Sequence, residues 1–183
     1  MNRNKTLLMV GGTMGVGKTA ACRLLKEKLN GCVFLDGDWC WDIHPFVVNR
    51  ENTAMALDNI VFLLRRFLQN PHIHTVIFCW VLHQDGIYEQ ILSRLFLGDG
   101  LPAEEIHVKK VSLLCAEQTL RERLGKDVAA GLRTSDVVER SVARLSLYSE
   151  LDTEKMPTDG LTAAEVADRL QVLIDPQTET EER

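Results

Sequence analysis

The sequence predicts an α/β protein in which a parallel sheet is covered by helices on both faces. Short apolar runs of strand length alternate with longer segments whose apolar residues recur at helical spacing. A glycine-rich loop joins the first apolar run to the first helical segment. The 183 residues, 45% of them hydrophobic, contain no linker that would divide two cores, so we expect one domain.

The order of the expected elements follows from these runs. The expected strands cover residues 7–10, 32–35, 75–80, 107–114 and, more weakly, 154–156. The expected helices cover residues 18–29, 53–69, 86–96, 116–124, 135–147 and 163–174.

Three boundaries carry their own physical signals. Asn70-Pro71 ends one helix, because proline disfavours helical geometry in the residue before it. Asn30-Gly31 ends another with a pair that tolerates positive φ. Thr162 and Glu165 have the spacing of a capping box, which opens the last helix.

Charge and cysteine usage restrict the partners and the location. A net charge of −5 argues against broad nucleic-acid binding, which needs a basic face. The five cysteines show no metal-ligand spacing and indicate reduced thiols. No apolar run is long enough for a signal sequence or a membrane span, so we expect a cytoplasmic monomer or homodimer without membrane contact. We expect a domain over residues 1–175 and a disordered acidic tail over 176–183.

The strongest motif is a phosphate-binding loop. The segment Gly-Thr-Met-Gly-Val-Gly-Lys-Thr at residues 12–19 matches G-x-x-x-x-G-K-[ST] in full, between an apolar strand and an amphipathic helix. Glycines let successive backbone N–H groups face a polyanion, and the helix N-terminus adds its positive dipole end. We therefore expect the triphosphate of ATP or GTP to bind here with Mg²⁺, Lys18 neutralising the β- and γ-phosphates and the Thr19 hydroxyl ligating the metal. The expected binding residues are Gly12, Thr13, Gly15, Val16, Gly17, Lys18, Thr19 and Ala20.

Two carboxylates follow the second expected strand. Asp36 and Asp38 flank Gly37 at the carboxyl end of that strand, where ligands gather in open α/β sheets. One carboxylate would support the Mg²⁺ shell while the other, Asp38, accepts a proton from an attacking hydroxyl. The alternative is a turn in which an aspartate merely caps the backbone.

The phosphate loop, the Leu35-Asp36-Gly37-Asp38 segment and the chain length together resemble small P-loop kinases of the shikimate, gluconate and adenylylsulfate kinase type. The resemblance implies a three-layer P-loop fold with a five-stranded parallel sheet of order 2-3-1-4-5 and a short lid. It also implies that Asp36 helps to place Mg²⁺ and that Asp38 contacts the acceptor hydroxyl.

The segment after the third expected strand departs from these kinases. It reads Phe-Cys-Trp-Val-Leu-His-Gln over residues 78–84, with neither a glycine triplet nor a G-x-P-R segment. Cys79-Trp80 also occupies the place of a Walker B acid, which shifts the task of positioning Mg²⁺ towards Asp36.

Arginines cluster between residues 119 and 144. A helix, a flexible loop over 125–134 and a second helix in succession look like a lid whose arginines close over the triphosphate. The resemblance favours Arg123 and Arg133 for this role. The alternative for each is a solvated helix face with acidic partners. The five candidates are Arg121, Arg123, Arg133, Arg140 and Arg144.

Aromatic and imidazole side chains follow the second and third expected strands and would line an acceptor pocket. We assign Trp39 and His83 to this pocket, beside Asp38. For Trp80 we expect core packing instead, because a strand end is normally buried.

These observations favour transfer of the γ-phosphoryl group of MgATP to a hydroxyl of a small molecule. Two alternatives keep the fold: a nucleotide or nucleoside kinase, and an antibiotic-modifying phosphotransferase of the chloramphenicol or tunicamycin-resistance kind. A further alternative is an AAA-type ATPase switch that hydrolyses nucleotide without a small-molecule acceptor.

Overall fold

A computed structural model describes residues 5–97 and 101–174 of the chain. Within them, five strands form one parallel sheet of order β2-β3-β1-β4-β5, which confirms the expected strand order. The strands are β1 (Lys5–Gly11), β2 (Cys32–Asp36), β3 (Thr75–Cys79), β4 (Ile106–Leu114) and β5 (Glu154–Pro157).

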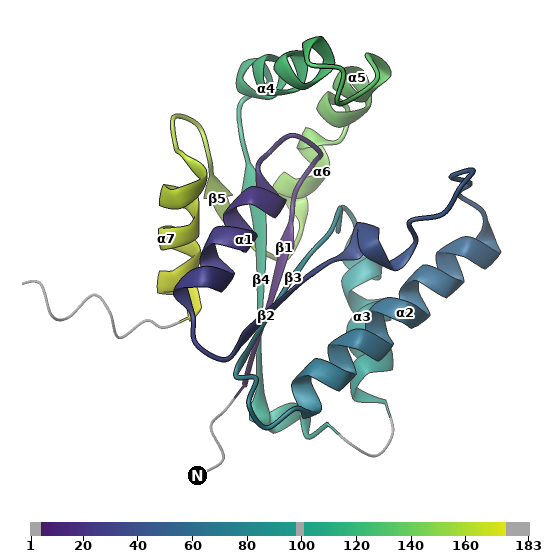
Figure 1. Cartoon of the computed structure of the whole chain (residues 1–183), viewed down its shortest axis with the longest axis vertical. Coiled ribbons are helices and arrows are strands. Elements are labelled where there is room, and N and C mark those ends of the chain that lie inside the picture. The colour runs from purple at the N-terminus through teal and green to yellow at the C-terminus, as the bar shows by residue number, and fades with distance from the viewer. Residues whose placement is uncertain (1–4, 98–100, 175–183) are drawn as a thin grey trace, which may run out of the picture.

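Helices cover both faces of this sheet, as Figure 1 shows. On one face lie α1 (Lys18–Lys28) and α7 (Ala163–Ile174), and on the other lie α2 (Arg50–Gln69) and α3 (Asp85–Phe96). The helices α4 (Glu117–Ala129) and α5 (Asp136–Val142) form the top of the view, with α6 (Leu145–Glu150) below them. Short 3-10 turns lie at η1 (Gly37–Cys40) and η2 (Ala103–Glu105). No helix in the described part of the chain is both long and apolar enough to cross a membrane.

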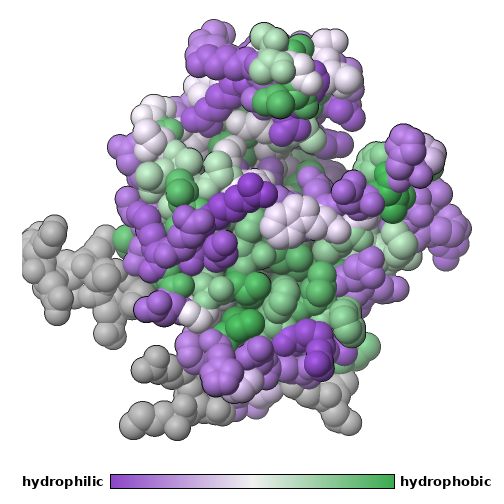
Figure 2. All heavy atoms as spheres, in the orientation of Figure 1, coloured by the Kyte–Doolittle hydropathy of each residue, from purple (hydrophilic) through white to green (hydrophobic). Residues whose placement is uncertain are grey.

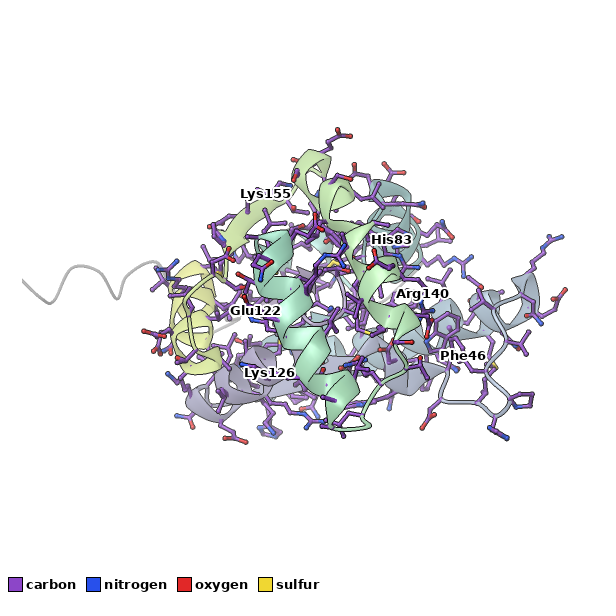
Figure 3. All side chains as sticks on the ribbon, turned by 90° about the horizontal axis from the view of Figure 1, so that it is seen from above. Phe46, His83, Glu122, Lys126, Arg140 and Lys155 are labelled. Atoms are coloured by element: carbon purple, nitrogen blue, oxygen red, sulfur yellow. The ribbon has the colours of Figure 1, made fainter. Side chains whose placement is uncertain are left out.

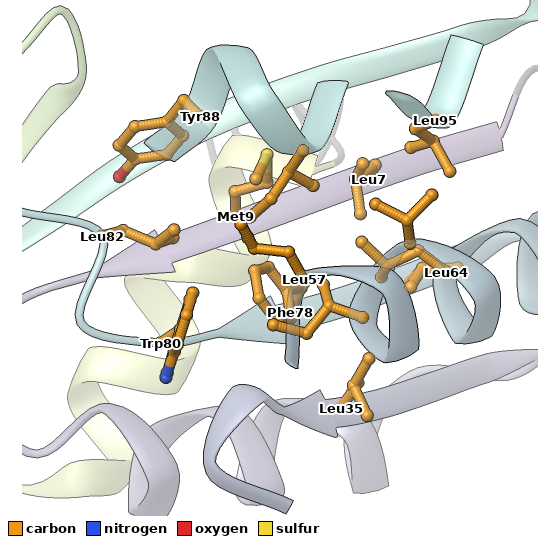
Figure 4. Packing of buried hydrophobic residues seen from close by; sticks show 14 of the residues in the cluster. Leu7, Met9, Leu35, Leu57, Leu64, Phe78, Trp80, Leu82, Tyr88 and Leu95 are labelled. Atoms are coloured by element: carbon orange, nitrogen blue, oxygen red, sulfur yellow. The ribbon is translucent and has the colours of Figure 1, made fainter. Parts of the chain in front are cut away.

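Side-chain alternation along the central strand divides the core between the two faces. In β1, Leu7 and Met9 point into the cluster under α2 and α3, whereas Leu8 and Val10 point into the cluster under α1 and α7. All four are fully buried. Figure 4 shows the first cluster, with Leu57 of α2 beside Phe78 of β3 and Leu64 further along α2. Burial on both faces explains why this strand reads as a continuous apolar run.

Several helix boundaries differ from the expected ones. Helix α2 begins at Arg50 rather than at residue 53, because the Asn49 side chain accepts a hydrogen bond from the Asn52 amide and caps the helix there. The expected helix 135–147 divides into α5 and α6, because the Arg144 amide bonds the Ser141 carbonyl three residues back and tightens the turn.

The prediction of a flexible loop over residues 125–134 is wrong for residues 125–129, which are helical. Helix α4 continues through Gly125 to Ala129, since one glycine inside a helix costs only about 1 kcal/mol. The remaining residues of that segment are exposed and lie between α4 and α5. The capping box at Thr162 and Glu165 is present, with the Thr162 amide donating to Glu165 Oε2 at 2.7 Å and the Glu165 amide to Thr162 Oγ1 at 3.2 Å. The expected tail 176–183 lies outside the described residues.

Candidate functional site

The carboxyl ends of β1, β2 and β3 meet at the upper edge of the sheet, and a cavity of about 480 Å³ lies above them. Figure 2 shows the surface hollowed between the α4–α5 segment at the top and the segment before α2 at the right. The cavity is lined by Met14, Gly15, Gly17, Lys18, Thr19, Ala20, Asp36, Asp38, Trp80, Val81, Arg123, Lys126, Asp127 and Arg133.

The phosphate loop lines this cavity with most of its residues and is buried at the others. Of the eight binding residues predicted from the sequence, Gly15, Gly17, Lys18, Thr19 and Ala20 line the cavity. Val16 is 1% exposed and packs into the core, and Thr13 is buried and donates its hydroxyl to the Ser141 carbonyl at 2.9 Å. Gly12 also lies outside the cavity lining. The loop is therefore anchored from below and from α5.

Glycine is required at position 15 by both its backbone and its surroundings. Gly15 has a φ of 85°, and a Cβ there would lie 2.7 Å from Leu124 side-chain atoms of α4. A side chain at this position would push α4 away from the loop. The close approach places the basic side chains of α4 beside the phosphate loop.

Lys18 rests on carbonyl groups of its own loop. Its Nζ donates to the Gly12 and Thr13 carbonyl oxygens at 2.8 and 3.0 Å. Burial lowers the pKa of Lys18 below its ordinary value, and the nearby side chains, which include Asp38 and Asp36, only partly oppose this effect. A polyanion in the cavity would favour the charged amine and offset the cost of its burial.

A hydrogen bond joins the helix after the loop to the second strand. The Thr19 hydroxyl donates to Asp36 Oδ2 at 2.8 Å, and Asp36 is 7% exposed. The other oxygen of Asp36 accepts the Asp38 amide at 3.2 Å. Two hard oxygen donors, the Thr19 hydroxyl and the Asp36 carboxylate, thus lie together at the cavity floor, which suits Mg²⁺.

Cys79 lies at the end of β3, in the position of a Walker B acid. Its sulfur lies 4.0 Å from the Thr19 hydroxyl oxygen. A hydrogen bond with Cys22, together with burial, raises the pKa of the Cys79 thiol above its ordinary value. The thiol therefore stays protonated and is no ligand for Mg²⁺. Asp36 is then the carboxylate nearest to Thr19 among the described groups.

Basic side chains line the opposite wall. Arg123 of α4 donates to the Val16 carbonyl at 3.2 Å and to the Thr158 carbonyl at 2.8 Å, which fixes its guanidinium against the loop. Arg133 pairs with Asp127 at 3.0 Å, and its Nη1 lies 2.8 Å from the Met14 sulfur. Lys126 also lines the cavity. Lys126 was not predicted from the sequence as a site residue. Its position three residues after Arg123, on the same helix face, could have indicated it.

The other three arginines have different surroundings. Arg121 pairs with Glu117 and Glu139, and Arg140 pairs with Asp136, all on the outer surface of α4 and α5. For these two the alternative reading as a solvated helix face is confirmed. Arg144 is half-buried and has no ion-pair partner in the described part of the chain.

The residues predicted for the acceptor pocket are only partly brought together. Asp38 lines the cavity, but Trp39 does not: it is 53% exposed and packs edge-on against Phe34. Trp80, which we expected only in the core, is 8% exposed and lines the cavity as well. Its indole Nε1–H donates to Asp38 Oδ1 at 3.0 Å.

His83 lies away from the phosphate loop. The chain turns at Leu82, a buried residue with a φ of 40°, and His83 is not among the cavity residues. Seen from above in Figure 3, His83 and Lys126 lie on different sides of α4. Burial, and secondarily Arg144, lower the pKa of His83, so the imidazole stays neutral at neutral pH. Its Nδ1 is buried without a hydrogen-bond partner in the structure as described.

Comparison with known protein families agrees with this geometry. A family model described as an AAA domain matches residues 8–140, which include the phosphate loop, the acidic pair and α4. The chain belongs to this AAA-domain family. No curated protein matches the sequence.

Solved structures similar to this AAA-domain protein include small kinases. A gluconokinase from Sinorhizobium meliloti 1021 is 15% identical, with a TM-score of 0.65 and coverage of 98% of this chain and 99% of the other. A shikimate kinase from Acinetobacter baumannii is 20% identical, with a TM-score of 0.59 and coverage of 97% and 96%. The tunicamycin resistance protein of Deinococcus radiodurans is 18% identical, with a TM-score of 0.61 and coverage of 93% and 96%. The predicted P-loop kinase fold is confirmed.

The burial of Lys18 generates a prediction that separates binding from folding. In Lys18→Met, we expect the stabilisation by MgATP to disappear, whereas the original protein should gain about 2.7 kcal/mol at a ligand concentration of 100 times Kd. The free variant should be no less stable than the original protein at neutral pH, because it no longer buries a charged amine. Thermal and urea unfolding with and without nucleotide measure both effects, with Lys26→Met as the control on the same helix.

The same variant has a predicted pH dependence. The pKa of Lys18 in the fold lies below the ordinary value of 10.5, so the unfolded chain holds the proton more tightly. The free energy of unfolding of the original protein should therefore rise relative to Lys18→Met as the pH increases towards 10.5. The assignment of Lys18 would be contradicted if the free energy of unfolding of the original protein minus that of Lys18→Met stayed constant or fell as the pH rose. A Lys18→Met variant that is still stabilised by MgATP would contradict it as well.

Proposed function

We propose that this protein transfers the γ-phosphoryl group of MgATP, or of MgGTP, to a hydroxyl group of a small molecule. The observation that carries the proposal is the Thr19–Asp36 hydrogen bond of 2.8 Å with Asp38 beside it in the same cavity. It places a phosphate loop, oxygen donors suited to Mg²⁺ and a second carboxylate around one cavity. A site for hydrolysis alone does not require a second carboxylate at the acceptor side.

The basic side chains of the cavity match the charge of a triphosphate. Lys18 would leave the Gly12 and Thr13 carbonyls for the β- and γ-phosphate oxygens. Lys126 and Arg133 face the same space from the α4–α5 side. As charge moves from the γ-phosphoryl group to the leaving diphosphate, these cations, once in contact with the nucleotide, stabilise it.

Thr19 and Asp36 would hold Mg²⁺, together with phosphate oxygens and water. No three histidine, cysteine, aspartate or glutamate side chains form a preformed metal cluster over residues 5–97 and 101–174, and this fits a metal that arrives with its nucleotide. The ion, when bound, would neutralise charge on the β- and γ-phosphate oxygens. The protein's part is to orient the hydroxyl of Thr19 and the carboxylate of Asp36.

Asp38 would act as the base. The acceptor oxygen attacks the γ-phosphorus, the bond from that phosphorus to the bridging oxygen breaks, and the diphosphate leaves with the bond's electron pair. The acceptor's proton passes to Asp38, whose exposed position at the cavity allows contact with an incoming hydroxyl.

A second candidate function is hydrolysis by an ATPase switch, favoured by the AAA-domain family match. The two functions differ in where the phosphoryl group goes. An acceptor screen should include polyols, hydroxy acids, nucleosides and hydroxylated antibiotics, the last because one similar structure is a tunicamycin resistance protein.

Substitution of Asp36 and of Asp38 should impair different steps. Asp38→Asn should bind MgATP normally and lower the rate of transfer by about 10²-fold or more, the usual contribution of a positioned base. Asp36→Asn should instead raise the Mg²⁺ concentration needed for half-maximal binding of nucleotide, because a metal-supporting carboxylate is lost. Asp42→Asn, in the exposed segment after η1, is the matched control. Full activity in both Asp36 and Asp38 variants would reduce the pair to a turn.

The segment between α4 and α5 should respond to the third phosphate. Residues 130–135 are all exposed, and the amides of residues 133–135, unlike those of 130–132, donate to no carbonyl in the described part of the chain. The amides of residues 133–135 should therefore exchange rapidly with solvent in the free protein. A non-hydrolysable MgATP analogue should protect them more than MgADP does, because only it presents the γ-phosphate to Arg133. Hydrogen exchange in the three states measures the difference.

Arg133→Gln should remove most of that extra protection and weaken binding of the analogue by about 10-fold, the worth of one charge-assisted hydrogen bond. Arg140→Gln is the matched control, since Arg140 pairs with Asp136 outside the cavity. Equal protection in all three states would mean that this segment is a fixed element and no lid.

A further inference from the structure

Trp80 contacts the carboxylate of the proposed base, Asp38. It is the first residue after β3, its side chain is 8% exposed, and its one polar atom donates to Asp38 Oδ1 at 3.0 Å. Indole N–H is a donor only, so it holds one oxygen of the carboxylate and leaves the other unengaged. We propose that Trp80 is the positioning residue for the base Asp38, an inference that rests on the proposed function.

Asp38 needs such a restraint because its side chain is on the exposed side of the 3-10 turn η1. Its backbone is fixed by the bond from its amide to Asp36 Oδ1 at 3.2 Å, but that bond leaves the side-chain torsions free. The Trp80 bond supplies the missing restraint and orients the unengaged oxygen. A base has to lie within hydrogen-bond reach of the proton that it removes, so orientation of this oxygen bears directly on the rate.

The indole is itself held firmly. The Trp80 amide donates to the Val10 carbonyl at 3.2 Å, which ties the residue to the end of β1 just before the phosphate loop. The ring packs edge-on against Trp41, with centroids 5.7 Å apart and an interplanar angle of 78°. Figure 4 shows the indole beyond Phe78, with its nitrogen directed away from the apolar cluster. Asp38 is thereby held in a fixed position relative to β1 and to the phosphate loop that follows it.

Gly37 makes this arrangement possible. A Cβ at position 37 would lie within 2.5 to 2.9 Å of three Trp80 side-chain atoms, closer than real contacts allow. The glycine between the two aspartates therefore gives the ring the space it occupies. The Asp36-Gly37-Asp38 segment and Trp80 form one unit, in which the residue after Cys79 orients a carboxylate in the turn that follows the neighbouring strand β2.

The contact is tested first without any acceptor. In a ¹H–¹⁵N spectrum the Trp80 indole N–H is identified as the resonance lost in Trp80→Phe. Asp38→Ala should shift this resonance upfield and speed its exchange with solvent, because its acceptor is removed. Asp42→Ala is the control and should leave it unchanged. An indole resonance that ignores Asp38→Ala would overturn the proposal.

Kinetics then separate positioning from packing. Trp80→Phe keeps an aromatic ring but removes the donor, and it should lower kcat by about 10-fold, the order expected for a misplaced catalytic group. The KM for MgATP should stay within about twofold, since the phosphate loop is untouched. Trp41→Phe changes the same packing without removing a bond to Asp38, and it should keep kcat near that of the original protein.

A Trp80→Phe variant with an unchanged kcat, or a Trp41→Phe variant that loses as much, would overturn the positioning role. Failure of the proposed function looks different: no compound then accepts the phosphoryl group from the original protein. In that case the positioning role in transfer falls with the function, while the resonance shift still reports the contact between Trp80 and Asp38.

Discussion

The hydrogen bond from the Thr19 hydroxyl to Asp36 is the contact on which the site depends. It joins the first turn of α1 to the end of β2, so the phosphate loop and the acidic pair are held at one edge of the sheet. Parallel pairing of β1, β2 and β3 brings these strand ends together, and burial of the sheet on both faces fixes their spacing. Trp80 extends the same arrangement to Asp38.

Basic side chains gather at the cavity although the protein as a whole is acidic. Its net charge is −5, yet four basic side chains face one cavity beside three aspartates. The basic residues are Lys18, Arg123, Lys126 and Arg133, and the acidic ones are Asp36, Asp38 and Asp127. In the free protein Lys18 is compensated by two carbonyl groups, Arg123 by carbonyl oxygens and Arg133 by Asp127. Such partners stabilise the unliganded site only partly, and a triphosphate would satisfy the same groups more fully. This is a physical reason for the anion preference of the proposed site.

Features set by neighbouring residues in the chain were predictable, and the strand order followed from the resemblance to small P-loop kinases. Contacts between side chains that follow different strands were not predictable. The phosphate loop and the place of Asp36 and Asp38 after an apolar strand follow from short sequence patterns. The role of Trp80 depends on a partner 42 positions earlier, and the need for Gly37 depends on how closely β2 and β3 approach. His83 was misplaced because a turn at the buried Leu82 redirects the chain, and no local pattern indicates a positive φ at leucine.

The destination of the γ-phosphoryl group tests the central claim most directly. The protein would be incubated with Mg²⁺, γ-labelled ATP or GTP and a library of small hydroxyl compounds, and the label would be separated into inorganic phosphate and phosphate esters. The account predicts that one class of compound acquires the label as a phosphomonoester, at a rate well above the release of inorganic phosphate and dependent on Asp38. Label recovered only as inorganic phosphate, at a rate unchanged by any compound and by Asp38→Asn, would contradict it.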